Sequence, residues 1–213
     1  ADIDPHTFNV DPARMARKIT PRTRALIPVD QLGLPCDIDA INALAYRHGL
    51  HVLDDAACAF ASGNQDRRVG SLTEVTVFSL HARKVITTGE GGMIVTNDAA
   101  FAKRLRMLRH QGMSLSDHAR HQMRPTEFEA YPEIGYNHRI TDIQAAIGLA
   151  QLDRLPEIIK RRRSIAERYS SALAQHPFLI PPKVPPGMQP NWQSYQITLS
   201  ADTPLSRNEV MDK

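Results

Sequence analysis

The sequence predicts an α/β fold in which a mainly parallel sheet is flanked by helices. Two observations lead to this prediction. In the first half of the chain, short apolar runs typical of buried strands alternate with segments of helical periodicity. The helices there begin at capping residues, and a strand follows soon after each of them, which is the order found in βαβ units. The 213 residues, 42% of them hydrophobic, suffice for one large domain and a piece of another.

The first helix is expected to begin after Asp11, because this N-cap residue precedes Pro12, and proline is favoured at the first helical position. A short buried strand follows at 25–29. Asp37 caps the next helix, whose apolar stripe ends before a glycine, and a strand at 51–54 follows at once. This order predicts strands that run parallel.

Two more strands are expected at 75–78 and 93–96, where β-branched and aromatic residues are frequent. Asp98 caps the helix that follows them. Residues 111–136 lack clear periodicity and hold many polar residues, so we expect a long loop. Loops of this length are often functional.

Two helices are expected after the long loop. The first opens with a capping box at Thr141 and continues to Leu152. The second begins at Pro156 and runs to about Ala174. The proline-rich stretch 177–190 cannot continue a helix and predicts an extended linker.

Beyond this linker, a strand is expected at 192–199 and a helix beginning at Ser206. We therefore divide the chain in two. We expect residues 1–155 to form a large domain that lacks its N-terminal part. We expect residues 156–213 to form a connecting helix and the beginning of a small, truncated C-terminal α+β domain.

Composition argues against several classes of protein. A net charge of +3, spread along the chain, gives little support for nucleic-acid binding. The basic run Lys160–Arg163 lies on a helix whose other face is apolar, so we interpret it as a solvated face. No apolar run is long enough to cross a membrane, and no leader peptide opens the chain. We expect a cytoplasmic protein.

Cysteine and histidine spacing predicts no metal site. The two cysteines, Cys36 and Cys58, form no CxxC pair and have no histidine at zinc-ligand spacing. Three histidines of the long loop lack acidic partners at useful spacing, so we expect them to be exposed loop residues rather than ligands. These are His110, His118 and His121.

Two acids follow one of the expected parallel strands. Asp54 and Asp55 lie at its carboxyl end, the edge at which open α/β sheets place their ligands. The same residues could equally end the strand in a turn or cap a helix. Taken alone, the pair leaves both interpretations open.

The end of the next expected strand carries a lysine. Lys84 stands between the polar strand end at Ser79 and the glycine cluster 89–92. A lone loop lysine is usually a solvated charge, and a glycine cluster is usually a turn. Glycine also lets the backbone pass close to a ligand. The combination at neighbouring strand ends favours a site.

The combination resembles the DegT/DnrJ/EryC1/StrS family of sugar aminotransferases, which are pyridoxal-phosphate enzymes of the aspartate-aminotransferase fold, fold type I. Three segments carry the resemblance most strongly, and their occurrence together in this order is highly specific. They are DDAACA at 54–59, FSLHARKVITTGEGGMIVTND at 78–98 and GYNHRITDIQAAIGLAQLDRL at 135–155. The resemblance extends over nearly the whole chain.

The resemblance implies the roles of the two central residues. Lys84 would bind pyridoxal 5'-phosphate covalently and act as the catalytic base, because its amine can hold the cofactor aldehyde and then shuttle a proton. Asp55 would pair with the pyridine nitrogen and keep it protonated. The ring can then accept electrons from the substrate.

Three further cofactor contacts are implied by the resemblance. Ser79 would bind the cofactor phosphate, and Asn137 would reach the phosphate in the neighbouring subunit of a homodimer with shared active sites. Asn137 could instead be a turn residue before the cap at Thr141. Cys58 stands where many relatives have Gln or His near the phenolic oxygen, and it could also be a small buried thiol.

The expected reaction moves an amino group from an amino acid, glutamate or glutamine, to a keto group of a nucleotide-linked sugar. Two alternatives remain at this point. A sugar dehydratase of the same fold uses histidine in place of the lysine, and Lys84 argues against it. A non-catalytic or regulatory relative would have lost the chemistry, whereas this chain keeps Asp55, Ser79 and Lys84.

Overall fold

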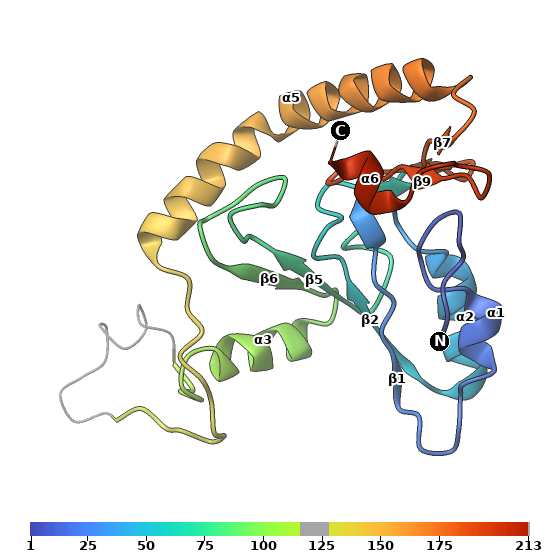
Figure 1. Cartoon of the computed structure of the whole chain (residues 1–213). Helices are drawn as coiled ribbons and strands as arrows, with labels where there is room; N and C mark the ends of the chain where they lie inside the picture. The colour runs from blue at the N-terminus through green and yellow to red at the C-terminus, as the bar shows by residue number, and fades with distance from the viewer. Residues whose placement is uncertain (116–127, 213) are drawn as a thin grey trace.

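The computed structural model describes residues 1–115 and 128–212 (Figure 1). Its helices are α1 (Pro12–Ala16), the 3-10 turn η1 (Gln31–Gly33), α2 (Ile38–His48), α3 (Ala99–Leu108), α5 (Asp142–Leu173) and α6 (Arg207–Met211). Its strands are β1 (Ala25–Leu26), β2 (His51–Asp55), β3 (Gly63–Asn64), β4 (Arg67–Arg68), β5 (Val75–Ser79), β6 (Gly92–Val95), β7 (Leu179–Ile180), β8 (Met188–Gln189) and β9 (Thr198–Leu199).

The central sheet has the strand order β1-β2-β5-β6. Strands β1, β2 and β5 run parallel, and β6 pairs antiparallel with β5 at the edge. The prediction of a mainly parallel α/β sheet is confirmed. Because β2 and β5 are neighbours, their carboxyl ends lie at the same edge of the sheet.

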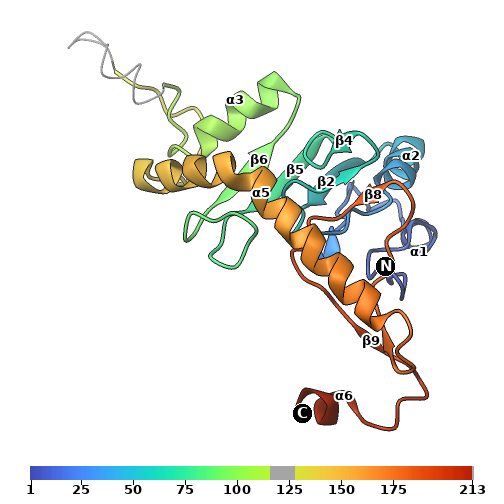
Figure 2. The same ribbon diagram turned by 90° about the horizontal axis from the view of Figure 1, so that it is seen from above.

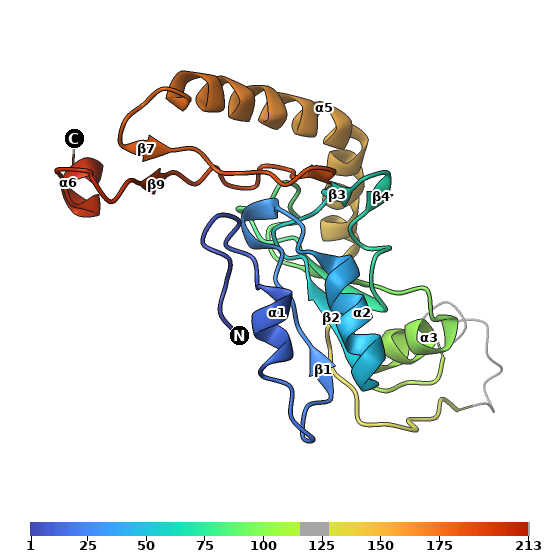
Figure 3. The same ribbon diagram turned by 90° about the vertical axis from the view of Figure 1, so that its right-hand side faces the viewer.

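Helix α2 lies against β1 and β2 on one face of this sheet, and α1 packs beside α2 (Figure 3). Helix α2 buries Ile38, Ile41 and Leu44 in the main core, which agrees with the apolar stripe expected after Asp37. The capping predictions hold throughout. Side-chain oxygens of the N-cap residues accept hydrogen bonds from the first turns of α1, α2, α3 and α5.

The first strand is shorter than expected. The structure gives β1 only two residues in place of the expected 25–29, and Ile27 is exposed. Pro28 has no N–H to donate to a neighbouring strand, so the ladder is interrupted there. Val29 then rejoins through a single parallel bridge to Asp55.

The prediction of two helices with a break before Pro156 is wrong. One helix, α5, runs from Asp142 to Leu173 with Pro156 inside it. Proline removes one hydrogen bond and bends a helix without always ending it. Figures 1 and 2 show the bend between the yellow and orange halves of α5.

The segment after α5 returns to the main body of the chain. In Figure 3 it runs back beneath that helix, and β8 pairs antiparallel with β3. The expected strand at 192–199 is reduced to β9, because Trp192 has a positive φ of 56° that no extended strand allows. A capping box at Ser206 opens α6 as expected. The two-domain division at residue 155 stays a prediction.

The expected long loop falls partly outside the described residues. Residues 111–115 and 128–136 contain neither helix nor strand, as expected. The expectation of an exposed His110 is wrong, because its side chain is buried after α3. His118 and His121 lie in the part that the structure does not describe. Among the described residues, no helix is long and apolar enough to cross a membrane.

Candidate active site

Two parallel strands deliver polar side chains to one edge of the sheet. Asp55 is the last residue of β2, and Ser79 is the last residue of β5. The register pairs Asp55 with Val77, so both strands end within about two residues of each other along the sheet. Both side chains are half-buried. The sheet therefore brings Asp55 and Ser79 to a common edge, as the sequence predicts.

Lys84 and Cys58 are in direct contact beside this edge. The Lys84 Nζ donates a hydrogen bond to the Cys58 Sγ at 3.2 Å, across 26 residues of sequence. Cys58 lies three residues beyond Asp55, so this contact joins the loop after β2 to the loop after β5. Four of the five expected cofactor residues thus lie at the carboxyl ends of β2 and β5 or on the loops that follow them.

The loop that carries Lys84 is held tightly at both ends. The Lys84 N–H donates to the His81 carbonyl at 3.0 Å, and the Leu80 N–H donates to the Gly91 carbonyl at 2.9 Å. Val85 and Ile86 are buried in a second apolar cluster under α5. A half-buried amine on such an anchored loop loses little conformational freedom when it reacts.

The glycine cluster closes this loop. Gly91 has a φ of 153°, and a Cβ at this position would lie 2.7 Å from the Thr88 Oγ1. No larger residue could therefore make the return from Thr88 to β6 without displacing the loop. The interpretation of the cluster as a turn is supported by this geometry, and the turn places Lys84 at the strand ends.

The other acid of the pair, Asp54, is fully buried and points to the opposite face of the strand from Asp55. Neither of its oxygens has a hydrogen-bond partner among the described residues. Burial, and then the nearby Asp30 and Asp55, raise the pKa of Asp54 to about 8. Asp54 is therefore a neutral acid at pH 7, and Asp55 is the acid that reaches the open edge.

Asp30 extends the buried acidic layer, and sequence reasoning missed it. Its pKa is raised to about 6, chiefly by burial, although a hydrogen bond of 2.7 Å from the Cys36 N–H opposes the rise. The Asp30 N–H donates to the Asp55 carbonyl at 3.0 Å. Burial and the neighbouring Asp30 charge raise the pKa of the Cys36 thiol, which makes it an inert core residue.

Asn137 lies apart from the other four residues. Its side chain is exposed, and its backbone forms an isolated antiparallel bridge with His110 at the end of α3. His110 also forms a hydrogen bond of 2.9 Å with Arg139. The structure does not bring Asn137 to Lys84 of the same chain.

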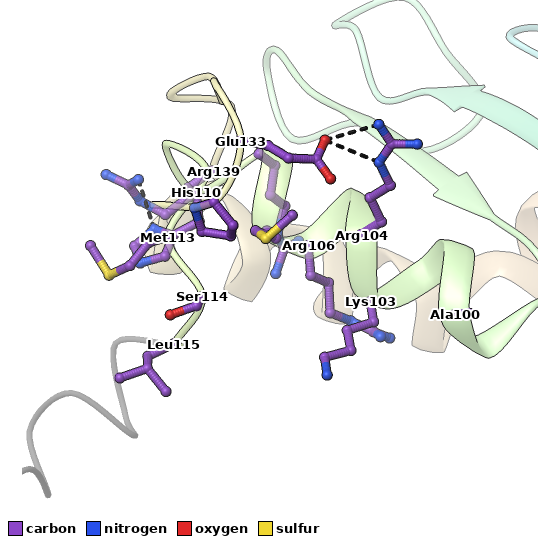
Figure 4. A pocket seen from close by; sticks show the side chains of 13 residues that line it. Ala100, Lys103, Arg104, Arg106, His110, Met113, Ser114, Leu115, Glu133 and Arg139 are labelled. Atoms are coloured by element: carbon purple, nitrogen blue, oxygen red, sulfur yellow. Dashed lines mark hydrogen bonds and ion pairs between the residues drawn. The ribbon is translucent and has the colours of Figure 1, made fainter. Parts of the chain in front are cut away.

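The pocket beside Asn137 is basic (Figure 4). It has a volume of about 650 Å³, and its charged lining consists of cations from α3 and the following loop, with Glu133 bound to Arg104 at 2.9 Å. None of Asp55, Cys58, Ser79 and Lys84 lines it. The pocket thus lies on the surface that carries Asn137.

Sequence reasoning also missed Asn191 and Gln193, which reach the loops of Cys58 and Lys84 from the far end of the chain. No local pattern marks these residues, because each lies in an irregular segment and acts over more than 100 residues of sequence. Their only signal in the sequence is that they are polar residues just after the proline-rich stretch.

Known proteins resemble this chain over most of its length. The chain is 43% identical to the spore coat polysaccharide biosynthesis protein SpsC of Bacillus subtilis over 195 residues, which cover 92% of the chain and 50% of SpsC. It is 44% identical to the GDP-perosamine synthase of Caulobacter vibrioides over 174 residues, 82% of the chain and 44% of that enzyme. The chain spans about half the length of these relatives.

The fold matches solved structures of the same kind. PseC of Helicobacter pylori, an aminotransferase of pseudoaminic acid biosynthesis, superposes with a TM-score of 0.86 at 30% identity, over 94% of this chain and 52% of PseC. The sequence pattern of the DegT/DnrJ/EryC1/StrS aminotransferase family matches residues 1–213. The chain belongs to this family of aminotransferases.

Proposed function

We propose that the protein containing this chain is a pyridoxal-phosphate-dependent aminotransferase that moves an amino group from an amino acid to a keto group of a nucleotide-linked sugar. The observation that carries the proposal is the contact of 3.2 Å between Lys84 and Cys58, at the strand ends that also hold Asp55 and Ser79. Family membership, and relatives that act in polysaccharide and sugar-nucleotide biosynthesis, support it.

The residues present fit pyridoxal phosphate by their chemistry. A primary amine, a half-buried carboxylate and a hydroxyl lie at or just beyond the ends of β2 and β5, and these are the groups needed for its aldehyde, ring nitrogen and phosphate. When bound, the cofactor supplies an electron sink for the bond broken in the substrate. We assign Lys84 to the aldehyde, Asp55 to the ring nitrogen, Ser79 to the phosphate and Cys58 to the phenolic side of the ring.

Each side chain has a distinct task in this proposal. The Lys84 amine would hold the cofactor and, once free, would act as the group that moves a proton at the substrate carbon. Asp55 keeps the proton on the pyridine nitrogen. Cys58 accepts a hydrogen bond from the Lys84 Nζ and so fixes where the amine stands before reaction.

The substrates follow from the family and the relatives. We propose glutamate or glutamine as amino donor and a keto-sugar nucleotide as acceptor, for polysaccharide, lipopolysaccharide or antibiotic sugar biosynthesis. GDP-perosamine synthase and SpsC are relatives with names of this kind. Free thiols at Cys36 and Cys58 and a nucleotide-linked substrate support a cytoplasmic location.

We also propose a homodimer with shared active sites. Asn137 is exposed and lies apart from Lys84 of its own chain. The cofactor site of a second copy of the chain is therefore the simplest one for it to complete. The segments before and after it in the chain also expose apolar side chains. Ile134 is 93% exposed, and Ile143, Ile147 and Leu149 on the first half of α5 are exposed as well. Exposed apolar side chains that gather on one surface indicate a protein interface.

The alternatives are separated by one residue. A dehydratase of this fold has histidine at the position of Lys84, whereas this chain has a lysine held by an anchored loop. A non-catalytic relative would have no need to keep Lys84 and Asp55 half-exposed at one sheet edge. Both observations favour the aminotransferase.

The direct test uses the complete protein. It is loaded with pyridoxal phosphate, reduced with borohydride, and mapped by mass spectrometry, and the loaded protein is then assayed with glutamate and keto-sugar nucleotides. We expect a pyridoxyl adduct on Lys84 and an aminated sugar. A folded, complete protein with no adduct on Lys84 contradicts the proposal.

Subunit mixing tests the shared site. A Lys84→Ala subunit and an Asn137→Ala subunit are each expected to be impaired alone. In a hybrid dimer, one of the two sites receives Lys84 from one chain and Asn137 from the other. Random mixing should therefore restore about a quarter of the parent activity, since half of the dimers are hybrids with one complete site each. Mixtures that stay at the level of the separate variants contradict the shared site.

A further inference from the structure

A short segment near the C-terminal end of the chain touches both loops of the candidate active site. It consists of residues 191–193 and comes after β8, the strand that pairs with β3. Arg162 of α5 holds it by donating from Nη1 to the Trp192 carbonyl at 2.8 Å. Figure 3 shows this part of the chain passing beneath α5. We call residues 191–193 the bridging segment.

Asn191 binds the loop that carries Cys58. It is fully buried, and its Nδ2 donates to the carbonyl oxygens of Cys58 at 2.8 Å and of Phe60 at 2.9 Å. Its N–H donates to the Ser62 Oγ at 3.1 Å. The Ser62 hydroxyl in turn donates to the Gly33 carbonyl at 2.8 Å. These bonds hold the loop after β2 from a segment that lies far from it in the sequence.

Asn191 is closely packed against the backbone of Gly33. Gly33 has a φ of 91°, and a Cβ built on it would overlap the Asn191 Oδ1. That oxygen accepts a hydrogen bond of 2.7 Å from the Gln193 N–H. Both N–H groups and the oxygen of the Asn191 side-chain amide are therefore hydrogen-bonded, and a buried amide bonded in this way holds one orientation.

Gln193 binds the loop that carries Lys84. Its Nε2 donates to the Arg83 carbonyl at 2.7 Å, one residue before the reactive amine, across 110 residues of sequence. Its Oε1 is buried and has no hydrogen-bond partner among the described residues. Among the described residues, the bond to the Arg83 carbonyl is therefore the only hydrogen bond of the Gln193 side chain.

We propose that Asn191 and Gln193 are positioning residues for the Lys84 and Cys58 pair. One holds the Cys58 carbonyl and the other holds the carbonyl next to Lys84, so the bridging segment sets the separation of the two loops from outside the sheet. Neither side chain is assigned a contact with substrate or cofactor. The role of these residues in catalysis rests on the proposed function. Their hydrogen bonds to the two loops do not depend on it.

The test compares Gln193→Met with Gln196→Met in the complete protein. Methionine matches glutamine in length and removes the bond to an exposed carbonyl that water can reach, so Gln193→Met should fold. Gln196 lies three residues after Gln193 and makes no side-chain hydrogen bond to either loop among the described residues, which makes it a matched control. Hydrogen exchange is measured on cofactor-free protein, followed by borohydride trapping after loading.

In Gln193→Met, the backbone amides of residues 80–88 should exchange hydrogen about fivefold faster than in the parent. The loss of one hydrogen bond raises the opening equilibrium of this loop by about that factor. Trapping of the pyridoxyl adduct on Lys84 should slow by a similar factor, with the thermal midpoint unchanged. Ser62→Ala, which loosens Asn191, should speed exchange in 57–62 and leave 80–88 as in the parent.

Three results would overturn the inference: parent-like exchange in Gln193→Met, an equal effect in Gln196→Met, or acceleration spread evenly over β2 and β5. The last would indicate a general loss of stability and no positioning role. If the parent protein yields no adduct at all, the proposed function fails, and the exchange data still decide whether the bridging segment holds the two loops.

Discussion

Replacing Lys84 with alanine is expected to abolish the pyridoxyl adduct after borohydride reduction and to lower amino transfer by about 10³-fold or more. A positioned proton-transfer group alone contributes roughly 10²–10⁴-fold to a rate. The same side chain also holds the cofactor in our proposal, and no other amine is in contact with Cys58 in the described part of the chain. The measurements are mass mapping of the reduced protein and the rate with a keto-sugar nucleotide.

The matched control is Lys103→Ala, which removes an exposed lysine of α3. This variant should keep both the adduct and the activity. An adduct of parent yield in Lys84→Ala, placed on any other residue, would show that the loop after β5 is not the point of attachment. A parent-like rate in that variant would remove Lys84 from the chemistry altogether.

Asp55→Asn should lower amino transfer by about 10²-fold while the adduct on Lys84 still forms. Asparagine cannot hold the proton on the pyridine nitrogen, and a hydrogen bond to a charged group is worth about 1.5–3 kcal/mol, where 1.4 kcal/mol corresponds to tenfold. The change keeps the shape of the side chain and its hydrogen bond from the Ala57 N–H. Rates and reductive trapping are measured together, so that binding and chemistry are separated.

Asp54→Asn is the neighbouring control, and it should behave differently. The folded pKa of Asp54, about 8, lies above its ordinary value of 3.8, so its contribution to stability is present below about pH 4 and is lost as pH rises through 8. Asparagine does not titrate, so the Asp54→Asn variant does not lose stability in this way as pH rises. Urea unfolding should show a flatter decline between pH 4 and pH 8, with activity near that of the parent. A 10²-fold loss in Asp54→Asn and none in Asp55→Asn would exchange the assigned roles.

Local signals account for the part of the fold that the sequence predicts well. An Asp or Thr before a periodic apolar run fixes a helix start through hydrogen bonds that reach only two or three residues, as at Asp37 and Thr141. The strands that end at Asp55 and Ser79 are short and strongly patterned. Their common edge follows from parallel pairing, so the core of the site was predictable.

Tertiary packing decided what the sequence could not show. Pro156 has the local signature of a helix start, yet Ile159 is buried next to Leu155 in the cluster under α5, and this packing carries the helix through the proline. Asn191 and Gln193 have no periodicity at all, since their partners lie 110 to 133 residues away. The pairing of Lys84 with Cys58 likewise needed the folded loops.

The long reach of Asn191 has a consequence for how the protein is made. Its bonds to Cys58 and Phe60 close loops of 133 and 131 residues, so they carry a large entropic cost and form late in folding. A ribosome adds about 5–20 residues per second, which means that both loops emerge roughly ten seconds before their tether does. During that interval the nascent chain carries the Lys84 amine and the Cys58 thiol on loops that lack the bonds from Asn191 and Gln193, and these bonds form only once synthesis has passed Gln193.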